Sequence, residues 1–356
     1  MKVLFTFYLP SGGVETLNRL RCESLQKCGI ECHVLYLRPG TGGHNQATFP
    51  VFITSEDEKI KEILLKHQYD AIIVTSDYLM LEHLRELGYK GILLYEAQGL
   101  GTRAYAEKLI IDAVPYLQRF CSAVLLPPTD HLLELFIKIC PWLHRYVIPN
   151  IVDVHSFRYI PAEPPKDPVI AWVGRLERNK NWPEYLEVAA SIRRSKPDLH
   201  LWMFHDPDLA SEGEAEQFEI LLHKLGLHDR LNVFTNIPNE IMPVYYSSIA
   251  SSGGFLISTS ITEGFGYAVA EALCCTCPVL STDSDGVRSF IVHNSSGKFY
   301  PLGNIEAATA EGLELMNNSK IRSAIRQQGR THMVTNFGEG PYAKSFREMI
   351  NSFGIF

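Results

Sequence analysis

Short apolar runs alternate with amphipathic segments along most of the chain. Continuous runs of Val, Ile and Leu are typical of strands that are buried on both faces, whereas apolar residues at every third or fourth position are typical of helices. In the first half, the apolar runs predict strands at 2–9, 31–37, 70–76 and 91–97. The amphipathic segments between them predict helices at 14–29, 57–67 and 78–88.

The same alternation starts again after residues 158–168, RYIPAEPPKDP, which have the proline-rich composition of a linker. In the second half we predict strands at 169–174, 199–205, 231–235, 254–260 and 277–282. The predicted helices are 182–195, 214–226 and one that begins within 261–287. Strands that alternate with helices indicate an α/β protein with parallel sheets covered on both faces. We therefore expect two doubly wound, Rossmann-like domains.

The boundaries that we expect are 1–158 for the first domain and 159–340 for the second. Residues 341–356 are expected to form a C-terminal helix that packs back toward the first domain. A length of 356 residues is more than one hydrophobic core usually supports, which agrees with two domains.

Composition excludes several classes of function. The net charge is −7 and neither half is basic, which excludes nucleic acid and an anionic membrane surface as the main partner. No apolar segment is long enough to span a membrane, and the apolar N-terminal stretch is too short for a signal peptide. We therefore expect a cytoplasmic protein with eight reduced cysteines. The cluster Cys274, Cys275 and Cys277 lacks zinc-site spacing and is expected to consist of buried, inert thiols.

Two segments at predicted strand ends carry groups that suit a phosphate. Gly12 and Gly13 open the first helix, where bare glycines and free amides let a phosphate approach the backbone. A simple tight turn explains the two glycines equally well, and the G-x-G-x-x-G pattern of dinucleotide sites is not matched. Arg175 and Lys180, in WVGRLERNKN, suit a diphosphate, and a solvated basic loop is the alternative.

The stretch EGFGYAVAE contains two glutamates with seven residues between them. Glu263 precedes Gly264, Phe265 and Gly266, whose amides are expected to face a ligand at the start of a helix. Eight helical residues span a little over two turns, so we expect Glu271 deeper on the same helix face. A carboxylate in an apolar stretch needs a partner, and vicinal ribose hydroxyls would provide one. A surface glutamate in a salt bridge is the alternative.

Taken together, four segments resemble the retaining glycosyltransferases of the GT-B fold, specifically their large family 4. Residues 263–271 match the motif E-G-F-G-x-x-x-x-E letter for letter. Residues 11–35 resemble the family's first glycine loop and helix, and residues 172–192 resemble its G-R-x-x-x-x-K segment. Residues 148–157 resemble P-N-G-V-D-x-x-x-F, with Ile151 in place of the usual glycine. The resemblance covers most of the chain, with the segments in the family's order.

The resemblance implies a GT-B protein that binds a nucleotide-sugar donor mainly through its second domain, in the cleft between the two. The donor-binding residues that it implies are Gly12, Gly13, Arg175, Lys180, Glu263, Gly264, Phe265, Gly266 and Glu271. Arg175 and Lys180 would bind the diphosphate and stabilise its charge as it leaves. Glu263 would bind hydroxyls of the donor sugar, and Glu271 would bind the ribose.

The resemblance also implies retention of the anomeric configuration without a divalent metal or another cofactor. The sequence offers neither an obvious nucleophile for a covalent intermediate nor an evident metal triad. The mechanism usually proposed for the family is front-face attack, in which the departing phosphate accepts the proton of the acceptor. UDP is the most common donor nucleotide in the family and is therefore expected here.

One position departs from the family pattern. Many members carry a histidine after the fourth strand of the first domain, where GILLYEAQG places Glu96, with Gln98 on the same side. Glu96 could replace the histidine as a catalytic, positioning residue, contact an unusual acceptor, or be structural in a weak or altered enzyme. The sequence leaves these three alternatives open.

Two rival functions and the acceptor also stay open at this point. A sugar-nucleotide 2-epimerase or a phosphorylase would need further acid–base groups or a pyridoxal phosphate lysine, and neither is evident. A nucleotide-sugar or carbohydrate-binding protein without turnover is the non-enzyme alternative. The acceptor, whether a sugar, a lipid-linked molecule, a protein or a small molecule, would meet loops at 39–50 and 97–105. Residues 103–120 are amphipathic, which allows peripheral membrane contact but favours a core-facing helix.

Overall fold

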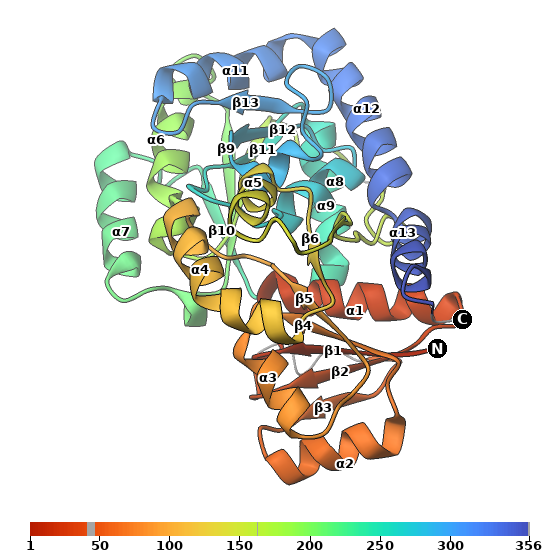
Figure 1. Ribbon diagram of the computed structural model, residues 1–356. Helices are drawn as coiled ribbons and strands as arrows, with labels where there is room; N and C mark the ends of the chain where they lie inside the picture. The colour runs from red at the N-terminus through yellow and green to blue at the C-terminus, as the bar shows by residue number, and fades with distance from the viewer. Residues whose placement is uncertain (41–46, 162, 355–356) are drawn as a thin grey trace. The chain divides into compact units, whose positions relative to one another are not determined.

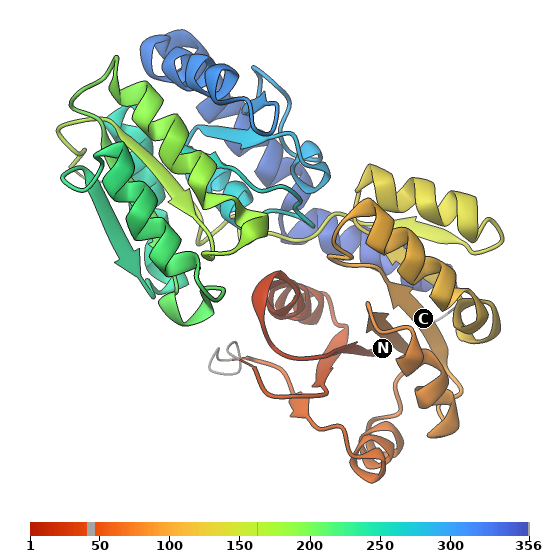
Figure 2. The same cartoon turned by 90° about the vertical axis from the view of Figure 1, so that its left-hand side faces the viewer.

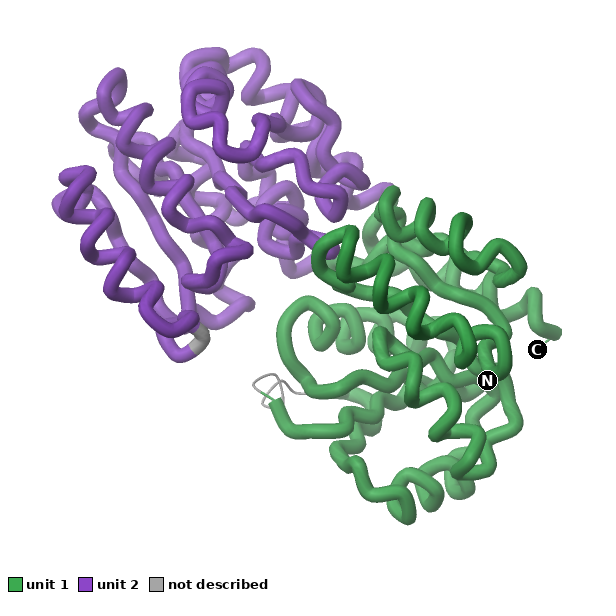
Figure 3. The backbone as a smooth tube through the Cα atoms, turned by 60° about the vertical axis from the view of Figure 1, so that its left-hand side comes forward, with its two compact units in different colours: residues 1–152, 336–356 green, residues 153–335 purple. Residues whose placement is uncertain are grey.

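The computed structural model describes residues 1–40, 47–161 and 163–354, and it divides into two compact units (Figure 3). Unit 1 contains Met1–Val152 and Asn336–Phe356, and unit 2 contains Asp153–Thr335. Each unit has one parallel sheet with helices packed on both of its faces (Figure 1). The predicted α/β class with two Rossmann-like domains is therefore confirmed.

The sheet of unit 1 has the strand order β3-β2-β1-β4-β5-β6-β7, and every neighbouring pair is parallel. Its strands are β1 (Lys2–Phe7), β2 (Glu31–Tyr36), β3 (Val51–Ile53), β4 (Ala71–Thr75), β5 (Ile92–Glu96), β6 (Ala123–Leu126) and β7 (Arg145–Val147). The helices of this unit are α1 (Gly12–Lys27), α2 (Asp57–His67), α3 (Leu79–Glu86), α4 (Arg103–Phe120), α5 (Asp130–Ile139) and α13 (Glu339–Asn351).

Alternate residues of the unit 1 strands pack against different helices, because successive strand side chains point to opposite faces. Leu4 and Val74 belong to the core shared with α2, α3, α4 and α5. Phe5 points to the other face, where its ring lies 5.9 Å from the ring of Phe346 on α13. Helix α4 buries Ala106, Ile110, Ala113 and Leu117, which confirms the core-facing helix predicted at 103–120.

The sheet of unit 2 has the order β10-β9-β8-β11-β12-β13 and is also parallel throughout. Its strands are β8 (Val169–Val173), β9 (His200–His205), β10 (Leu231–Thr235), β11 (Phe255–Ser258), β12 (Val279–Thr282) and β13 (Lys298–Tyr300). Its α-helices are α6 (Trp182–Arg193), α7 (Glu214–Leu225), α8 (Met242–Ser252), α9 (Tyr267–Cys274), α10 (Asp285–Arg288), α11 (Ile305–Asn317) and α12 (Ser319–Phe337). The last two residues of α12 belong to unit 1. Short 3₁₀ helices are η2 (Arg178–Lys180), η3 (Pro207–Leu209) and η4 (Asn239–Ile241).

One face of the unit 2 sheet is covered by α6, α7 and α11. Their apolar residues share a core with Trp172 on β8 and Phe255 on β11, both fully buried. Figure 2 shows α6 and α7, in green, side by side along this face. Helices α8 and α9 contact β11 from the opposite side.

The unit boundaries differ by a few residues from the predicted ones. Unit 2 begins at Asp153 rather than at 159, because Arg330 on α12 donates hydrogen bonds to the carbonyl oxygens of Val154 and Phe157, each at 2.8 Å. The proline-rich segment also belongs to unit 2, where the Ile160 amide donates to Ser247 Oγ on α8 at 2.9 Å. Unit 1 resumes at Asn336 rather than at 341, and α13 packs against α1 within that unit.

Candidate active site

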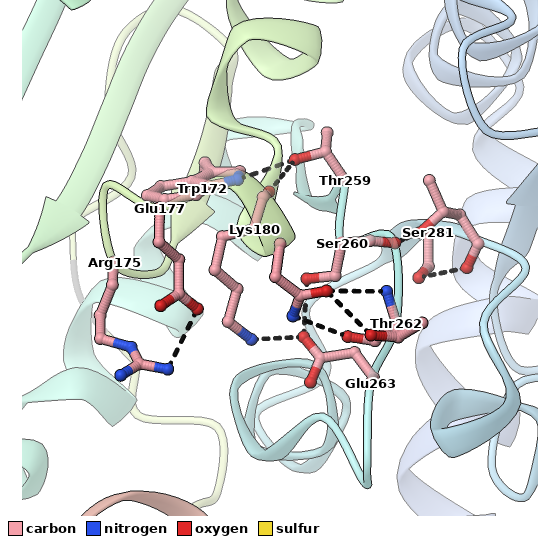
Figure 4. A network of polar contacts seen from close by, with 11 residues as sticks. Trp172, Arg175, Glu177, Lys180, Thr259, Ser260, Thr262, Glu263 and Ser281 are labelled. Carbon is pink, nitrogen blue, oxygen red and sulfur yellow. Dashed lines mark hydrogen bonds and ion pairs between the residues drawn. The ribbon is translucent and has the colours of Figure 1, made fainter. Parts of the chain in front are cut away.

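The loops that follow β8 and β11 in unit 2 bring together a cation and a carboxylate predicted from the sequence. Both strands end at the carboxyl edge of a parallel sheet, the edge at which α/β proteins bind ligands. Lys180 Nζ, from the β8 loop, lies 2.5 Å from Glu263 Oε1, from the β11 loop (Figure 4). The two side chains are 22% and 12% exposed, so this ion pair is partly shielded from water.

One oxygen of Glu263 accepts both of the hydrogen bonds that its side chain makes. Ser260 Oγ donates to Glu263 Oε1 at 2.7 Å, on the same atom that receives Lys180. Among the described residues, none donates a hydrogen bond to Glu263 Oε2. A carboxylate oxygen has further acceptor capacity, so Oε2 can accept from a hydroxyl of a ligand.

Asn179 links the β8 loop to the β11 loop through both the nitrogen and the oxygen of its side-chain amide. Its side-chain Nδ2 donates to the Thr262 carbonyl at 3.0 Å, and its Oδ1 accepts from Thr262 N at 3.2 Å and from Thr262 Oγ1 at 2.8 Å. The Asn179 carbonyl in turn accepts from the Ile261 amide at 2.8 Å. These bonds hold Lys180 and Glu263, the neighbours of Asn179 and Thr262, side by side.

Thr259 adds a second connection between the same two loops. Its hydroxyl donates to the Lys180 carbonyl at 2.8 Å and accepts from Trp172 Nε1 at 3.0 Å, and all three residues are labelled in Figure 4. Gly174 allows this arrangement, because an added Cβ there would lie 2.7 Å from the Trp172 ring. The backbone position of Lys180 is therefore set by a buried network, whereas its side chain remains partly exposed.

Arg175 is held more loosely than Lys180. Its guanidinium lies 3.0 Å from Glu177 Oε1, and its side chain is 53% exposed. An exposed ion pair of this kind contributes little to stability, so the guanidinium is free to exchange Glu177 for another anion. The exposed guanidinium is therefore accessible to an anion, as the predicted diphosphate contact requires.

The glycines after Glu263 form a tight loop against α10. Gly266 has a φ of 86° in the left-handed region, and an added Cβ there would lie 2.9 Å from Val287. A Cβ at Gly286 would lie 2.4 Å from the Glu263 carbonyl oxygen. Phe265 is buried between the rings of Tyr267 and Phe290, so the loop is anchored at its centre.

The expectation that Glu263 and Glu271 lie on one helix face is wrong. Helix α9 begins at Tyr267, so Glu263 belongs to the preceding loop and helical spacing does not apply to it. Glu271 is inside α9 and 7% exposed, as predicted for a carboxylate in an apolar stretch. Burial, and then the charge of nearby Glu271, raises the pKa of the fully buried Tyr246 well above its ordinary value. The low exposure of Glu271 argues against the surface position of the alternative reading.

In unit 1, Gly12 and Gly13 are the first two residues of α1, directly after the carboxyl end of β1. Both are exposed, and Gly12 has a φ of 62° with no atom within 4 Å of an added Cβ. The backbone at the N-terminus of α1 is therefore open to a ligand, as a phosphate contact requires.

Glu96, at the end of β5, is 2% exposed and fully engaged by other side chains of unit 1. Arg21 Nη1 donates to both carboxylate oxygens, at 2.7 and 2.9 Å, and Thr75 Oγ1 donates to Oε2 at 2.7 Å. Gln98 donates more weakly to Oε1 at 3.4 Å. Burial alone would lower the pKa of Arg21, but the adjacent Glu96 carboxylate outweighs it and the pKa is raised. The geometry argues against a catalytic role for Glu96 and favours the structural alternative.

Sequence reasoning did not find the residues that position the two loops: Asn179, Thr259, Ser260, Thr262 and Gly286. Asn179 and Thr262 are 83 residues apart, so no local spacing indicates their contact. The one available signal is the polar run S-T-S-I-T that directly follows the apolar residues of β11.

The three clustered cysteines are completely buried and form no disulfide, as predicted. Burial raises the pKa of Cys274 to about 12 and that of Cys277 to about 12. Thiols of this kind are neither nucleophiles nor metal ligands at neutral pH.

The two Rossmann-like parallel-sheet units of this chain have the architecture of a GT-B fold, which its solved structural neighbours share. A model of the family "Glycosyl transferases group 1" matches residues 154–332, which is 179 of the 356 residues. The chain therefore belongs to this family.

Two curated relatives illustrate the level of similarity. The trehalose synthase of Thermococcus litoralis is 21% identical over 203 residues, which are 53% of this chain and 45% of that protein. The N-acetylgalactosamine-N,N'-diacetylbacillosaminyl-diphospho-undecaprenol 4-alpha-N-acetylgalactosaminyltransferase of Campylobacter jejuni is 29% identical over 170 residues, 47% of this chain and 42% of that protein. The matches span about half the length of these relatives or less.

Solved structures agree with the fold over the whole chain. Alr3699/HepE of Anabaena, solved in complex with UDP, has a TM-score of 0.83 with 18% identity and covers 99% of this chain and 100% of its own. Sucrose-phosphate synthase from Thermosynechococcus elongatus has a TM-score of 0.80 with 17% identity, and 99% of each chain is covered. At this identity the likeness shows the fold alone.

No helix in the described part of the chain is both long enough and apolar enough to cross a membrane.

Proposed function

We propose that the protein is a retaining glycosyltransferase that moves a sugar from a nucleotide diphosphate sugar, first of all a UDP-sugar, to a hydroxyl group of an acceptor. The observation that carries this proposal is the Lys180–Glu263 pair, held at the carboxyl ends of β8 and β11 with Arg175 close by in sequence. Membership of the glycosyl transferases group 1 supports the reaction class. The UDP bound by Alr3699/HepE supports the donor class.

The cationic side chains of the site would bind the phosphates of the donor, and the carboxylates would bind its hydroxyl groups. Lys180 has three N–H donors, so its ammonium can keep Glu263 and still donate to a phosphate oxygen. Arg175 adds a guanidinium that binds two phosphate oxygens at once. Glu263 accepts from a sugar hydroxyl through Oε2, and Glu271, inside α9, accepts from the ribose.

The reaction that we propose breaks the bond between the anomeric carbon and the β-phosphate oxygen. The acceptor oxygen attacks the anomeric carbon from the same face, and its proton passes to the departing phosphate oxygen. The products are the new glycoside, with the donor's anomeric configuration, and the nucleoside diphosphate. Lys180 and Arg175 stabilise the negative charge that builds on the diphosphate, which is the role that a divalent metal has in other transferases. We therefore expect activity without added metal.

We expect the acceptor to be a sugar, a lipid-linked molecule, a protein or a small molecule that carries a free hydroxyl. The C. jejuni relative is named for a diphospho-undecaprenol acceptor, which makes a lipid-linked sugar the first to test. The acceptor loop expected at 39–50 falls partly outside the described residues. The eight cysteines are all free, in agreement with a reducing compartment such as the cytoplasm.

The alternative is a nucleotide-sugar-binding protein without turnover. Glu96 favours it, because the position that carries a histidine in many relatives is here closed in a buried ion pair. Release of nucleoside diphosphate from the donor distinguishes a transferase from a protein that only binds nucleotide sugars.

The experiment incubates the protein with UDP-, GDP- and ADP-sugars in EDTA and measures the release of nucleoside diphosphate, with and without a panel of acceptors. We expect one donor nucleotide to be released, and the release to fall at least a hundredfold in Glu263→Gln. The matched control is Glu219→Gln, which changes an exposed glutamate on α7. Tight binding of one donor with no release under any condition would favour the binding protein instead.

A further inference from the structure

Two histidines and a glutamate of unit 1 converge at the edge of the sheet opposite to its carboxyl ends. Glu31 is the first residue of β2, and His33 lies two residues further on, which places both side chains on one face of the strand. His67 is the last residue of α2. One ligand atom from each of the three lies within 4.8 Å of the others.

The spacing of these atoms is close to that of a zinc coordination sphere. Zinc binds imidazole nitrogen and carboxylate oxygen at about 2.0–2.2 Å, which places ligand atoms about 3.3 Å apart at tetrahedral angles. His33 Nε2 and Glu31 Oε1 are 3.1 Å apart. The His33 and His67 rings are nearly perpendicular, at 85°, with centroids 4.7 Å apart.

Tyr69 holds the His33 ring in the orientation that a metal ligand needs. His33 is 1% exposed, and its Nδ1 lies 2.8 Å from the Tyr69 hydroxyl. Metal-bound histidines almost always donate their second ring N–H to an oxygen, which fixes the tautomer. With the proton on Nδ1 and donated to Tyr69, Nε2 carries the lone pair, and it is this atom that lies next to Glu31 Oε1.

The cluster reaches solvent on one side. Glu31 is exposed and His67 is partly exposed, whereas His33 closes the inner side against the rings of Phe52 and Tyr69. Three protein ligands and an open side suit a metal whose remaining position is taken by water.

We propose that Glu31, His33 and His67 bind a divalent transition-metal ion of the zinc class, which ties the end of α2 to the start of β2. Imidazole nitrogen is a ligand that zinc, copper and nickel share, whereas magnesium and calcium prefer oxygen. These three residues are separate from the Lys180–Glu263 pair, which belongs to unit 2, and the proposal does not depend on the proposed function. The sequence had offered no evident metal triad, because 34 residues separate His33 from His67.

Lys2 competes with the metal for Glu31. Its Nζ lies 3.1 Å from Glu31 Oε1, the same oxygen that faces His33. The ammonium must leave that oxygen before a metal binds it, and Lys2 can do so because its side chain is 25% exposed. Replacing Lys2 by glutamine should therefore strengthen metal binding.

The test uses the full chain without a polyhistidine tag, stripped with EDTA and dialysed, and titrated with zinc chloride by calorimetry. Cobalt(II) chloride provides a second readout, because tetrahedral cobalt absorbs visible light. We expect one ion per chain, with the affinity reduced at least tenfold in His67→Gln and in Glu31→Gln. Both residues are accessible, so these variants should fold, and circular dichroism checks that they do. Tyr69→Phe should weaken binding by about ten- to a hundredfold, because it removes the acceptor for His33.

His83→Gln is the matched control, since His83 Nε2 lies 2.9 Å from Asp57 Oδ1 in the same unit but belongs to no three-ligand group among the described residues. Its affinity for zinc should equal that of the wild type, whereas Lys2→Gln should bind more tightly. Failure of the wild type to bind zinc or cobalt would overturn the proposal. Equal binding by wild type and His67→Gln would overturn it as well, since the ion would then lie elsewhere.

Discussion

Lys180 Nζ lies 2.5 Å from Glu263 Oε1, although the two residues are 83 positions apart in the chain. The contact joins the predicted diphosphate-binding segment to the predicted sugar-binding segment at one edge of the unit 2 sheet. Its partial burial strengthens the attraction relative to a surface pair, because less water screens the two charges.

Replacing Lys180 by methionine should lower kcat/KM for the donor by about a hundred- to a thousandfold, the usual cost of one group that stabilises developing charge. The stem of the side chain is conserved in this variant, so the loss reports on the charge. Steady-state kinetics with the preferred donor measures the effect.

The matched control for Lys180→Met is Lys224→Met, which removes a charge from α7. It should leave kcat/KM within about twofold of the wild-type value, as expected of an exposed lysine outside the site. Equal losses in the two lysine variants would contradict the role given to Lys180.

Asn179 is predicted to position Lys180 and Glu263 without touching the donor. Asn179→Ala removes three side-chain hydrogen bonds to Thr262, and unfolding should become easier by about 1–3 kcal/mol, because polar groups lose their partners. The donor KM should rise as the loops separate. Urea denaturation and donor kinetics measure the two effects.

A conservative change at the same position separates positioning from general loss of structure. Asn179→Asp keeps the acceptor oxygen for Thr262 and loses the Nδ2 donor, so it should retain more activity than Asn179→Ala. Asn232→Ala, an exposed asparagine on β10, is the neutral control. If Asn179→Ala destabilised the fold but left the donor KM unchanged, the positioning role would be wrong.

The buried pair of Arg21 and Glu96 should behave as a structural unit. Arg21→Met leaves the Glu96 carboxylate buried without its guanidinium, which should destabilise the fold by about 3–5 kcal/mol. The double variant Arg21→Met, Glu96→Leu should lose less than the sum of the two single variants, because no unpaired charge remains. A double-mutant cycle by urea denaturation measures the coupling, and additive losses would exclude the structural role.

Much of the fold could be predicted from the sequence, because long apolar runs such as 70–76 have few alternatives to a buried strand. The strands that the periodicity missed are short and lie at or beside sheet edges: β3, β7 and β13 have three residues each, and β6 has four. A run of three residues is too short to show a period.

Within the candidate site, the sequence identified the residues that belong to recognisable motifs. It did not identify the residues whose hydrogen bonds hold those motifs in place. Arg175, Lys180 and Glu263 follow strands in patterns that can be read locally, whereas Asn179 acts through a partner 83 residues away. The sequence left the role of Glu96 open for the same reason, because its partner Arg21 lies 75 residues before it. A side chain's partner across the sheet is set by the tertiary fold, and a single sequence does not show it.

Thiol reactivity should report the burial of the cysteines. Cys28 is exposed, and burial raises the pKa of Cys121 to about 12 and that of Cys140 to about 11, with Cys274 and Cys277 at about 12. At pH 8 these raised values leave almost no thiolate, the form that reacts. Ellman's reagent should therefore modify one thiol rapidly in the folded protein and all eight after denaturation. Rapid modification of several thiols in the native state would contradict the packing around β12.

The raised pKa values of the buried thiols also predict how the stability of the fold changes at alkaline pH. The folded state holds these thiol protons more tightly than the unfolded state, so their contribution to stability is complete below the unfolded pKa of about 8.5. It declines as the pH rises above that value toward the folded pKa of about 12. Denaturation at pH 8 and at pH 10 in the presence of a reductant measures the difference.

The central claim is that unit 2 carries a donor site built from Lys180, Glu263 and Glu271. The most direct test is thermal unfolding with UDP, GDP, ADP and their sugars in EDTA, for the wild type and for Glu271→Ala. A ligand at a hundred times its Kd stabilises a protein by about 2.7 kcal/mol, or roughly five to ten degrees for a chain of this size. We expect such a shift with one nucleotide, and we expect Glu271→Ala to abolish it. Absence of a shift with every nucleotide, or an equal shift in Glu271→Ala, would contradict it.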